Sequence, residues 1–302
     1  MKILKNLPTP EELRKELPLS QADLGKKCIR DAQIKSALTG TGAPYLLIIG
    51  PCSAHCYDAV MEYAELLKRL AHDVSEQFLI VPRVYTAKPR TAGVGYMGML
   101  HEPNGLYTAR KLHLDILEQF GLSCADEMLY PSLLPYFDDL IGYFAVGARS
   151  VLNQEHRLVA SGINLPVGIK NPLSGDLNDL EAAVNSANSP HEFIFRDNFV
   201  QTGGNPLAHG ILRGAIDAPN YAQAGKLNMP IIIDASHGNS CKNPLNQREV
   251  AIEALKIPNV RGVMIESFTH AGQSMTDPCL TWEQTRELVH NLAQRILYPK
   301  NI

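Results

Sequence analysis

The sequence lacks any apolar run long enough to cross a membrane, and its longest apolar runs have the length of single strands. It also lacks an excess of one charge, with 28 Lys and Arg against 31 Asp and Glu and a formal net charge of −3. We therefore expect neither a nucleic acid nor a membrane surface as a partner. The first 17 residues become charged at once, so we expect no signal peptide.

Cysteines are few and are scattered through the chain, which does not indicate a disulfide framework. They are Cys28, Cys52, Cys56, Cys124, Cys241 and Cys279. Free thiols at such spacing fit a reducing compartment, so we expect a cytoplasmic protein.

No Gly-x-Gly-x-x-Gly sequence follows the first candidate strand, which disfavours a doubly wound dinucleotide-binding sheet. From residue 45 onwards, short apolar runs alternate with longer amphipathic runs, as is typical of parallel strands and crossover helices. The eight candidate strands are residues 45–50, 78–84, 122–127, 143–149, 165–170, 192–196, 230–236 and 261–266. This pattern predicts an α/β fold, a (β/α)₈ TIM barrel over residues 44–302. We expect residues 1–43 to form a short N-terminal helical extension that caps the barrel bottom or contacts another subunit.

Polar side chains recur where the predicted strands end. Because active sites of (β/α)₈ barrels lie at the carboxyl ends of the strands, we expect these side chains to share one site. They are Cys52, Arg83, Lys88, Arg90, Glu127, Arg149, Lys170, Arg213, His237, Glu266 and Asp277. Any one of them could be a surface charge, but their recurrence at the same end of successive strands favours a common site.

Four of these residues offer one sulfur, one nitrogen and two carboxylates, and they are Cys52, His237, Glu266 and Asp277. Such mixed ligands suit a divalent transition metal and disfavour calcium, which prefers oxygen ligands only. Mn²⁺ is our first choice, with Fe²⁺, Co²⁺ or Zn²⁺ as alternatives. His55, Cys56 and His270 lie near these ligands in the sequence. We expect them not to be ligands, because Cys52 and Glu266 already occupy the strand ends. The alternative for Cys52 is a thiol packed in the core, since free cysteine is often buried.

The remaining cations would be costly to gather unless an anion compensates them. Arginine side chains bind phosphate and carboxylate in a bidentate manner, and lysine adds a point charge. So many cations predict a phosphorylated carboxylate together with a second phosphate. Separate solvated charges fit the sequence PRVYTAKPRT poorly, because it places several basic groups next to a core strand.

Several short motifs together resemble one known family. They are IIGPCSAH (48–55), PRVYTAKPRT (82–91), GARS (147–150), QEHRLVASG (154–162), PVGIKN (166–171), ILRG (211–214), PNY (219–221), DASHGNS (234–240), GVMIES (262–267) and SMTDPCLTW (274–282). In this order, over residues 45–282, the chain resembles the type I, alpha-subgroup 3-deoxy-D-arabino-heptulosonate 7-phosphate (DAHP) synthases of the shikimate pathway. The N-terminal extension is similar as well.

The resemblance implies a metal-dependent condensation of phosphoenolpyruvate with erythrose 4-phosphate, the first step of aromatic amino acid biosynthesis. It implies a homo-oligomer, a dimer or a tetramer. The implied metal ligands are Cys52, His237, Glu266 and Asp277, and the implied phosphoenolpyruvate-binding cations are Arg83, Lys88, Arg149, Lys170 and Arg213. Arg90 and Thr91 fall on the aldose-phosphate contacts. The catalytic set is Lys88 as proton donor, Glu127 beside the substrate, and Cys52 and His237.

The chain departs from the family at three places. Met97 stands where the family usually has lysine, residues 101–110 are shorter, and residues 151–153 replace a more polar run. These places lie near the aldehyde side, so the same condensation on a different phosphorylated aldose is a second hypothesis. A third is a Schiff-base aldolase using Lys170 or Lys88, which leaves the four metal ligands unexplained. A fourth is a non-catalytic homologue that binds a metabolite.

Overall fold

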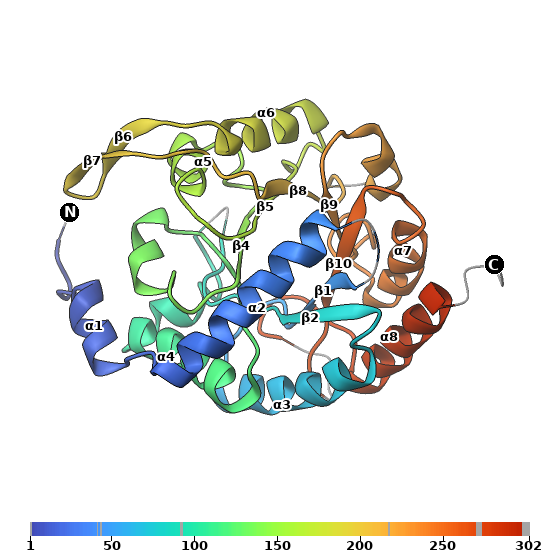
Figure 1. Cartoon of the computed structure of the whole chain (residues 1–302), viewed down its shortest axis with the longest axis horizontal. Helices are drawn as coiled ribbons and strands as arrows, with labels where there is room; N and C mark the ends of the chain where they lie inside the picture. Colours follow the sequence, from blue (N-terminus) through green and yellow to red (C-terminus); the bar gives the residue numbers. More distant parts are fainter. Residues whose placement is uncertain are drawn as a thin grey trace.

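The computed structural model describes residues 2–40, 42, 44–90, 93–216, 218–269 and 274–297 of the chain. Eight parallel strands form one sheet in the order β2-β1-β10-β9-β8-β5-β4-β3 (Figure 1). Their bounds are β1 Tyr45–Gly50, β2 Phe78–Pro82, β3 Ala125–Glu127, β4 Tyr143–Val146, β5 Val167–Lys170, β8 Ala208–Leu212, β9 Ile231–Asp234 and β10 Val260–Glu266. The first and last strands of this order meet at a parallel bridge between Arg83 and Ala125. The predicted (β/α)₈ barrel is therefore confirmed.

The strands are continuous apolar runs because both of their faces are covered. In β1, Leu46 and Ile48 belong to the cluster that fills the barrel interior. Leu47 and Ile49, on the alternate face, belong to the cluster between the strands and the helices. Alternation of side chains along a strand thus places every residue of the run in a core.

Helices follow most strands and surround the barrel (Figure 1). They are α3 Tyr57–Asp73, α4 Gly105–Phe120, α5 Gln154–Ala160, α6 Leu177–Asn188, α7 Gln247–Ala254 and α8 Trp282–Leu297. Shorter 3₁₀ turns are η1 Met99–His101, η2 Pro131–Tyr136, η3 Tyr221–Lys226 and η4 Pro244–Asn246. In α3, the buried residues Val60, Ala64 and Leu67 recur at helical spacing, so one stripe of the helix packs on the barrel. Among the described residues, no helix has the length and apolar character needed to cross a bilayer.

Two helices precede the barrel, α1 (Pro10–Glu16) and α2 (Gln21–Thr39). The Ser20 hydroxyl accepts a hydrogen bond from the Asp23 backbone N–H and caps the start of α2. Ile34 and Leu38 of this helix are buried in the same cluster as the interior side chains of the strands. Helix α2 therefore packs across the end of the barrel where the strands begin (Figure 1).

One predicted barrel strand, residues 192–196, lies outside the barrel, and that assignment is wrong. β6 (Glu192–Phe195) pairs with β7 (Asn198–Gln201) as an antiparallel hairpin. Along β6, Phe193 and Phe195 pack against the core while Ile194 is 76% exposed, a pattern of a half-buried strand.

The sixth strand of the barrel is instead β8, which is buried along its whole length. His209 and Gly210 interrupt its apolar run, which is why periodicity did not reveal it. The His209 ring is satisfied inside the barrel by Tyr143, whose hydroxyl lies 2.7 Å from His209 Nε2. Arg213 therefore directly follows a barrel strand, as Arg83 does after β2.

Candidate active site

The carboxyl ends of the strands surround a cavity of about 370 Å³. Most of the residues expected at this site line it, because parallel strands bring their last residues to one end of the barrel. These residues are Arg83, Lys88, Arg90, Glu127, Arg149, Lys170, Arg213, His237 and Asp277. Lys242, which was not expected, also lines it. Thr91 and His270 lie outside the residues that the structure describes.

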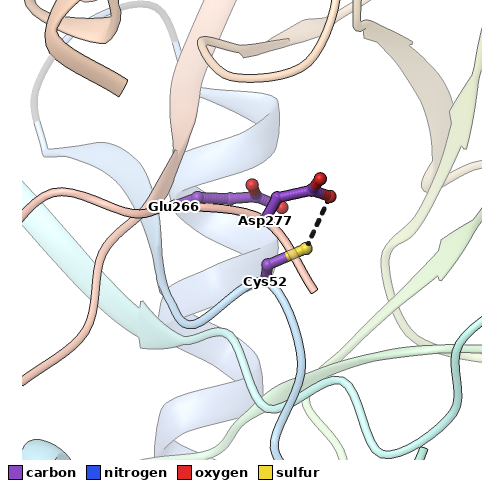
Figure 2. A group of neighbouring side chains, drawn as sticks. All are labelled: Cys52, Glu266 and Asp277. Atoms are coloured by element: carbon purple, nitrogen blue, oxygen red, sulfur yellow. Dashed lines mark hydrogen bonds between the residues drawn. The ribbon is translucent and has the colours of Figure 1, made fainter. Parts of the chain in front are cut away.

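Three of the four expected metal ligands converge in one group. The thiol of Cys52, which follows β1, and the carboxylates of Glu266 and Asp277 have ligand atoms within 4.8 Å of one another (Figure 2). These three residues are called the donor group below. Cys52 Sγ donates a hydrogen bond to Asp277 Oδ2 at 3.2 Å. Cys52 and Glu266 are buried, whereas Asp277 is exposed at the mouth. The segment that carries Asp277 returns to the barrel through a bridge between Ser267 and Leu280.

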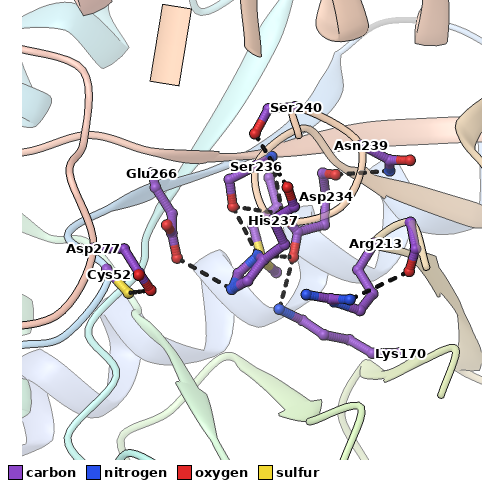
Figure 3. Close-up of polar contacts among 12 residues, drawn as sticks. Cys52, Lys170, Arg213, Asp234, Ser236, His237, Asn239, Ser240, Glu266 and Asp277 are labelled. Atoms are coloured by element: carbon purple, nitrogen blue, oxygen red, sulfur yellow. Dashed lines mark hydrogen bonds and ion pairs between the residues drawn. The ribbon is translucent and has the colours of Figure 1, made fainter. Parts of the chain in front are cut away.

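His237 lies beside this group rather than within it. Its Nε2 atom is 3.6 Å from Glu266 Oε1, while its Nδ1 atom is 2.9 Å from Asp234 Oδ2 (Figure 3). The contact with Asp234 orients the ring and leaves Nε2 directed toward the carboxylate of Glu266. A histidine held through one nitrogen by a carboxylate, with the other nitrogen directed at further metal-ligating groups, has the arrangement of a metal ligand.

Asp234, the last residue of β9, was missed by the sequence analysis. Its carboxylate also receives a hydrogen bond from Lys170 Nζ at 2.7 Å and two from Ser236. Burial alone raises its pKa, but the charges of His237 and Lys170 outweigh burial and hold the pKa well below its ordinary value. The available sequence signal was a carboxylate at a strand end, three residues before His237.

The electrostatics of the thiol fit a divalent cation. Burial, followed by the nearby charge of Glu266, raises the pKa of Cys52 to about 11, and the cations Lys88 and Arg83 offset this only in part. Glu266 Oε1 is buried and forms no hydrogen bond with the described residues, although Arg83 Nη2 lies 3.0 Å away. A cation here would stabilise the thiolate and occupy the unsatisfied oxygen. These donors form a possible site for a transition metal.

Two cations connect the donor group to the cavity. Lys88 Nζ donates to the carbonyl oxygen of Cys52 at 2.7 Å and to its Sγ at 3.1 Å. Arg83 is 1% exposed, stacks over the Tyr85 ring at 3.9 Å and pairs with Glu266. Both cations are therefore held in place by the protein before any substrate binds.

The other cations lie across the cavity, where β4, β5 and β8 end. Burial lowers the pKa of Arg213, and the like charge of Arg149 acts in the same direction although Asp234 opposes it. The Arg213 backbone N–H donates to Asn171 Oδ1 at 2.9 Å, and Asn171 also accepts from Asn220 at 3.2 Å. This buried amide network, also missed by the sequence analysis, fixes the end of β8. An anion bound between Arg213 and Arg149 would relieve their repulsion.

Glu127 and Arg90 lie at the rim. Glu127 ends β3 and is half-buried, and a Cβ atom on Gly147 would collide with its carboxylate. The glycine of the GARS motif thus leaves room for this acid beside the cations. Arg90 Nε donates to the carbonyl oxygen of Tyr96 at 2.9 Å, which ties Arg90 to its own loop.

The chain is similar in sequence and in structure to proteins of one known family. Residues 21–294 match the model of the DAHP synthetase I family. The chain is 36% identical to the Tyr-sensitive phospho-2-dehydro-3-deoxyheptonate aldolase of Escherichia coli (strain K12), over 95% of this chain and 92% of the relative. It is 33% identical to the tyrosine-inhibited aldolase of the same name from Schizosaccharomyces pombe (strain 972 / ATCC 24843), over 94% and 88%. The structure of phospho-2-dehydro-3-deoxyheptonate aldolase from Francisella tularensis SCHU S4 superposes with a TM-score of 0.92 and 33% identity, over 100% of both chains.

Proposed function

Since this chain belongs to the DAHP synthetase I family, we propose that it condenses phosphoenolpyruvate with erythrose 4-phosphate. The products are 3-deoxy-D-arabino-heptulosonate 7-phosphate and phosphate. The chain is an enzyme of the 3-deoxy-7-phosphoheptulonate synthase class, which acts in aromatic amino acid biosynthesis. The observation that supports the substrate assignment most is the donor group of Cys52, Glu266 and Asp277 beside a cavity lined by cations.

Cys52, His237, Glu266 and Asp277 would hold a divalent metal, with Mn²⁺ as our first choice. When bound, the metal would act as a Lewis acid that polarises the aldehyde carbonyl. The contact between Asp234 and His237 Nδ1 supports this assignment, because it keeps Nε2 on the side of Glu266. Six free cysteines, Cys52 among them, suit the reducing cytoplasm that we propose as its location.

The cations would bind phosphoenolpyruvate. We assign its phosphate and carboxylate to Arg83, Lys88, Arg149, Lys170 and Arg213, all of which line the same cavity. Contacts with Glu266 and Asp234 already order Arg83 and Lys170, so little side-chain freedom is lost on binding. Arg90, at the rim, and Thr91 would bind the phosphate of the aldose.

Two residues, Lys88 and Glu127, would assist proton transfer during the reaction. C3 of phosphoenolpyruvate forms a bond to the aldehyde carbon, and the resulting alkoxide takes a proton from Lys88. Lys88 is suited to this because its Nζ atom touches both the donor group and the cavity. Water then adds at C2 with help from Glu127, and the bond between C2 and the phosphate oxygen breaks to release phosphate.

An assay of phosphate release tests the proposal and also the choice of aldehyde. The purified protein, loaded with Mn²⁺, is given phosphoenolpyruvate and one of several aldose phosphates. We expect phosphate release to be fastest with erythrose 4-phosphate, and loss of activity on chelation with recovery on adding Mn²⁺. Faster turnover with another aldose phosphate would overturn the substrate, and borohydride trapping of an enzyme-bound imine would overturn the mechanism.

We also propose residues 44–302 as the catalytic domain and residues 1–43 as an extension of it. The burial of Ile34 and Leu38 in the interior cluster supports an extension that completes the barrel core. Because those side chains are shared with the barrel, we expect a chain that begins at residue 44 to be far less stable than the full chain.

A further inference from the structure

The seam where the barrel closes between β2 and β3 is irregular. Its ladder contains a single bridge, with the Val84 N–H donating to the carbonyl oxygen of Ala125 at 2.9 Å. In a regular parallel pair, Thr86 would next donate to the carbonyl of Glu127, and Glu127 to that of Val84. Here both N–H groups donate instead to one side-chain atom, Asp126 Oδ1, at 2.9 Å and 2.7 Å. The carboxylate of Asp126 therefore replaces two ladder bonds at the mouth of the barrel.

The second oxygen of Asp126 is also fully used. Asp126 Oδ2 accepts a hydrogen bond from the Thr86 hydroxyl at 2.6 Å and lies 3.1 Å from His113 Nε2 of helix α4. Asp126 and His113 are 4% and 2% exposed, and the His113 and Phe137 rings pack at a steep angle, 5.9 Å between centroids. A buried carboxylate is costly unless its hydrogen bonds are satisfied, and this one has four donors. The cluster of Thr86, His113 and Asp126 is called the seam cluster below.

The seam cluster lies directly behind two residues of the site. Thr86 is two residues before Lys88, whose Nζ lies 3.1 Å from Cys52 Sγ, and Asp126 precedes Glu127. Alternation along β3 turns Asp126 toward the helices while Glu127 faces the cavity. A small cavity of about 30 Å³ borders Thr86, Asp126 and Glu127. It has room for about one water molecule.

We propose that Asp126, oriented by His113, is a positioning residue that sets the separation of Lys88 and Glu127 across the seam. This inference rests on the proposed function, because Lys88 and Glu127 serve there as the proton donor and the acid that aids water addition. Without the carboxylate, the N–H groups of Thr86 and Glu127 lose their acceptor. The two segments then shift apart, while the metal donors, none of which is carried by β2 or β3, stay in place.

The test compares variants by steady-state phosphate release. We expect Asp126→Ala to lower kcat about 100-fold, the effect of a displacement of about 1 Å at a reacting group. Asp126→Asn keeps an oxygen acceptor for both N–H groups and should recover most of that loss. We expect His113→Leu to lower kcat about tenfold, as the loss of one hydrogen bond to a charged group would, and His113→Gln to restore part of it. Mn²⁺ affinity should stay within about twofold of the parent in all four variants, since none of them touches a metal donor.

Ile116→Ala is the matched control, because Ile116 is a fully buried residue of the same helix that belongs to the apolar cluster. It should lower stability without lowering kcat. If Ile116→Ala and Asp126→Ala lower kcat equally at equal loss of stability, the seam cluster is structural only and the inference is wrong. Equal kcat in Asp126→Ala and the parent would overturn it as well.

Hydrogen exchange separates this inference from the proposed function. If the parent protein releases no phosphate with any aldose phosphate, the proposed function fails, but exchange at the amides of Thr86 and Glu127 still reports on the seam. We expect these amides to exchange faster in His113→Leu and Asp126→Ala, with protection restored in Asp126→Asn. Unchanged protection in both of the first two variants would overturn the positioning role. His113→Leu serves alone if Asp126→Ala does not fold.

Discussion

The two ends of the barrel are built on opposite principles. At the amino end, Ile34 and Leu38 of α2 pack on the interior apolar side chains and close the core. At the carboxyl end, the buried groups are a thiol, acids and cations, and Glu266 Oε1 has no hydrogen bond with the described residues. Burying such groups lowers stability, whereas apolar burial raises it. The comparison indicates that apolar packing at the amino end supplies stability. This stability allows the carboxyl end to hold buried polar groups whose hydrogen bonds are not all satisfied.

The largest effect that would test this comparison is at Cys52. We expect Cys52→Ala to lower turnover by at least about a thousandfold, since a Lewis acid supplies several kcal/mol of transition-state stabilisation. The midpoint of urea denaturation should change little, because the buried thiol is small. Cys124→Ala, at a buried thiol away from the cavity, is the control and should keep full turnover. Turnover near the parent rate in Cys52→Ala would mean that the thiol is only packed.

At the amino end, the opposite result is expected. Ile34→Ala and Leu38→Ala should each lower the free energy of unfolding by about 2–5 kcal/mol, the cost of a cavity in a packed core. kcat and KM should stay as in the parent. Ile29→Ala, at a side chain of α2 that is 61% exposed, should have almost no effect on either quantity. A loss of kcat in Leu38→Ala at a temperature where the variant is folded would contradict the claim that the amino end contributes only to stability.

Asp234→Asn sharpens the comparison, because Asp234 touches the site through His237 and Lys170. We expect metal affinity to fall about 10- to 100-fold, the usual effect of removing a carboxylate that orients a histidine ligand. Isothermal titration of the metal-free protein with Mn²⁺ measures this. Asp197→Asn, in the exposed hairpin, is the control. Equal Mn²⁺ affinities in Asp234→Asn and the parent would show that Asp234 does not contribute to metal binding.

The hairpin of β6 and β7 belongs to neither end and gives the smallest expected effect. Ile194 and Phe199 form a cross-strand pair and are 76% and 73% exposed. We expect Ile194→Ser to change the free energy of unfolding by no more than about 0.5 kcal/mol. Thermal denaturation and the phosphate-release assay should both match the parent. A shift of several degrees in Tm would place this hairpin in the stabilising part of the molecule.

Much of the fold could be predicted because continuous apolar runs and amphipathic helices follow each other along the chain. The run 192–196 was placed in the barrel wrongly, since its apolar content alone does not reveal that Ile194 faces solvent. β8 was missed because His209 interrupts an otherwise apolar run, and its pairing with Tyr143 depends on the closed barrel.

The expectation that active-site residues lie at the carboxyl ends of the strands identified most of the candidate site residues. It could not identify the buried polar groups that hold those residues in position. Asp234 was overlooked because the neighbouring His237 was the more obvious ligand at that strand end. His113 and Asp126 look like ordinary polar positions of a helix and a strand, and only the closed seam makes them partners. Long-range pairing of buried polar groups leaves no local pattern in the sequence, so this part of the site required the structure.

The account depends most on a metal that is held by the Cys52 thiolate, and absorption spectroscopy with Co²⁺ tests that directly. Titrating the metal-free protein should give a sulfur-to-metal charge-transfer band in the near ultraviolet that saturates at about one equivalent per chain. The band should be absent in Cys52→Ser and present in Cys124→Ser. An undiminished band in Cys52→Ser, or no band in the parent at saturating Co²⁺, would contradict the assignment.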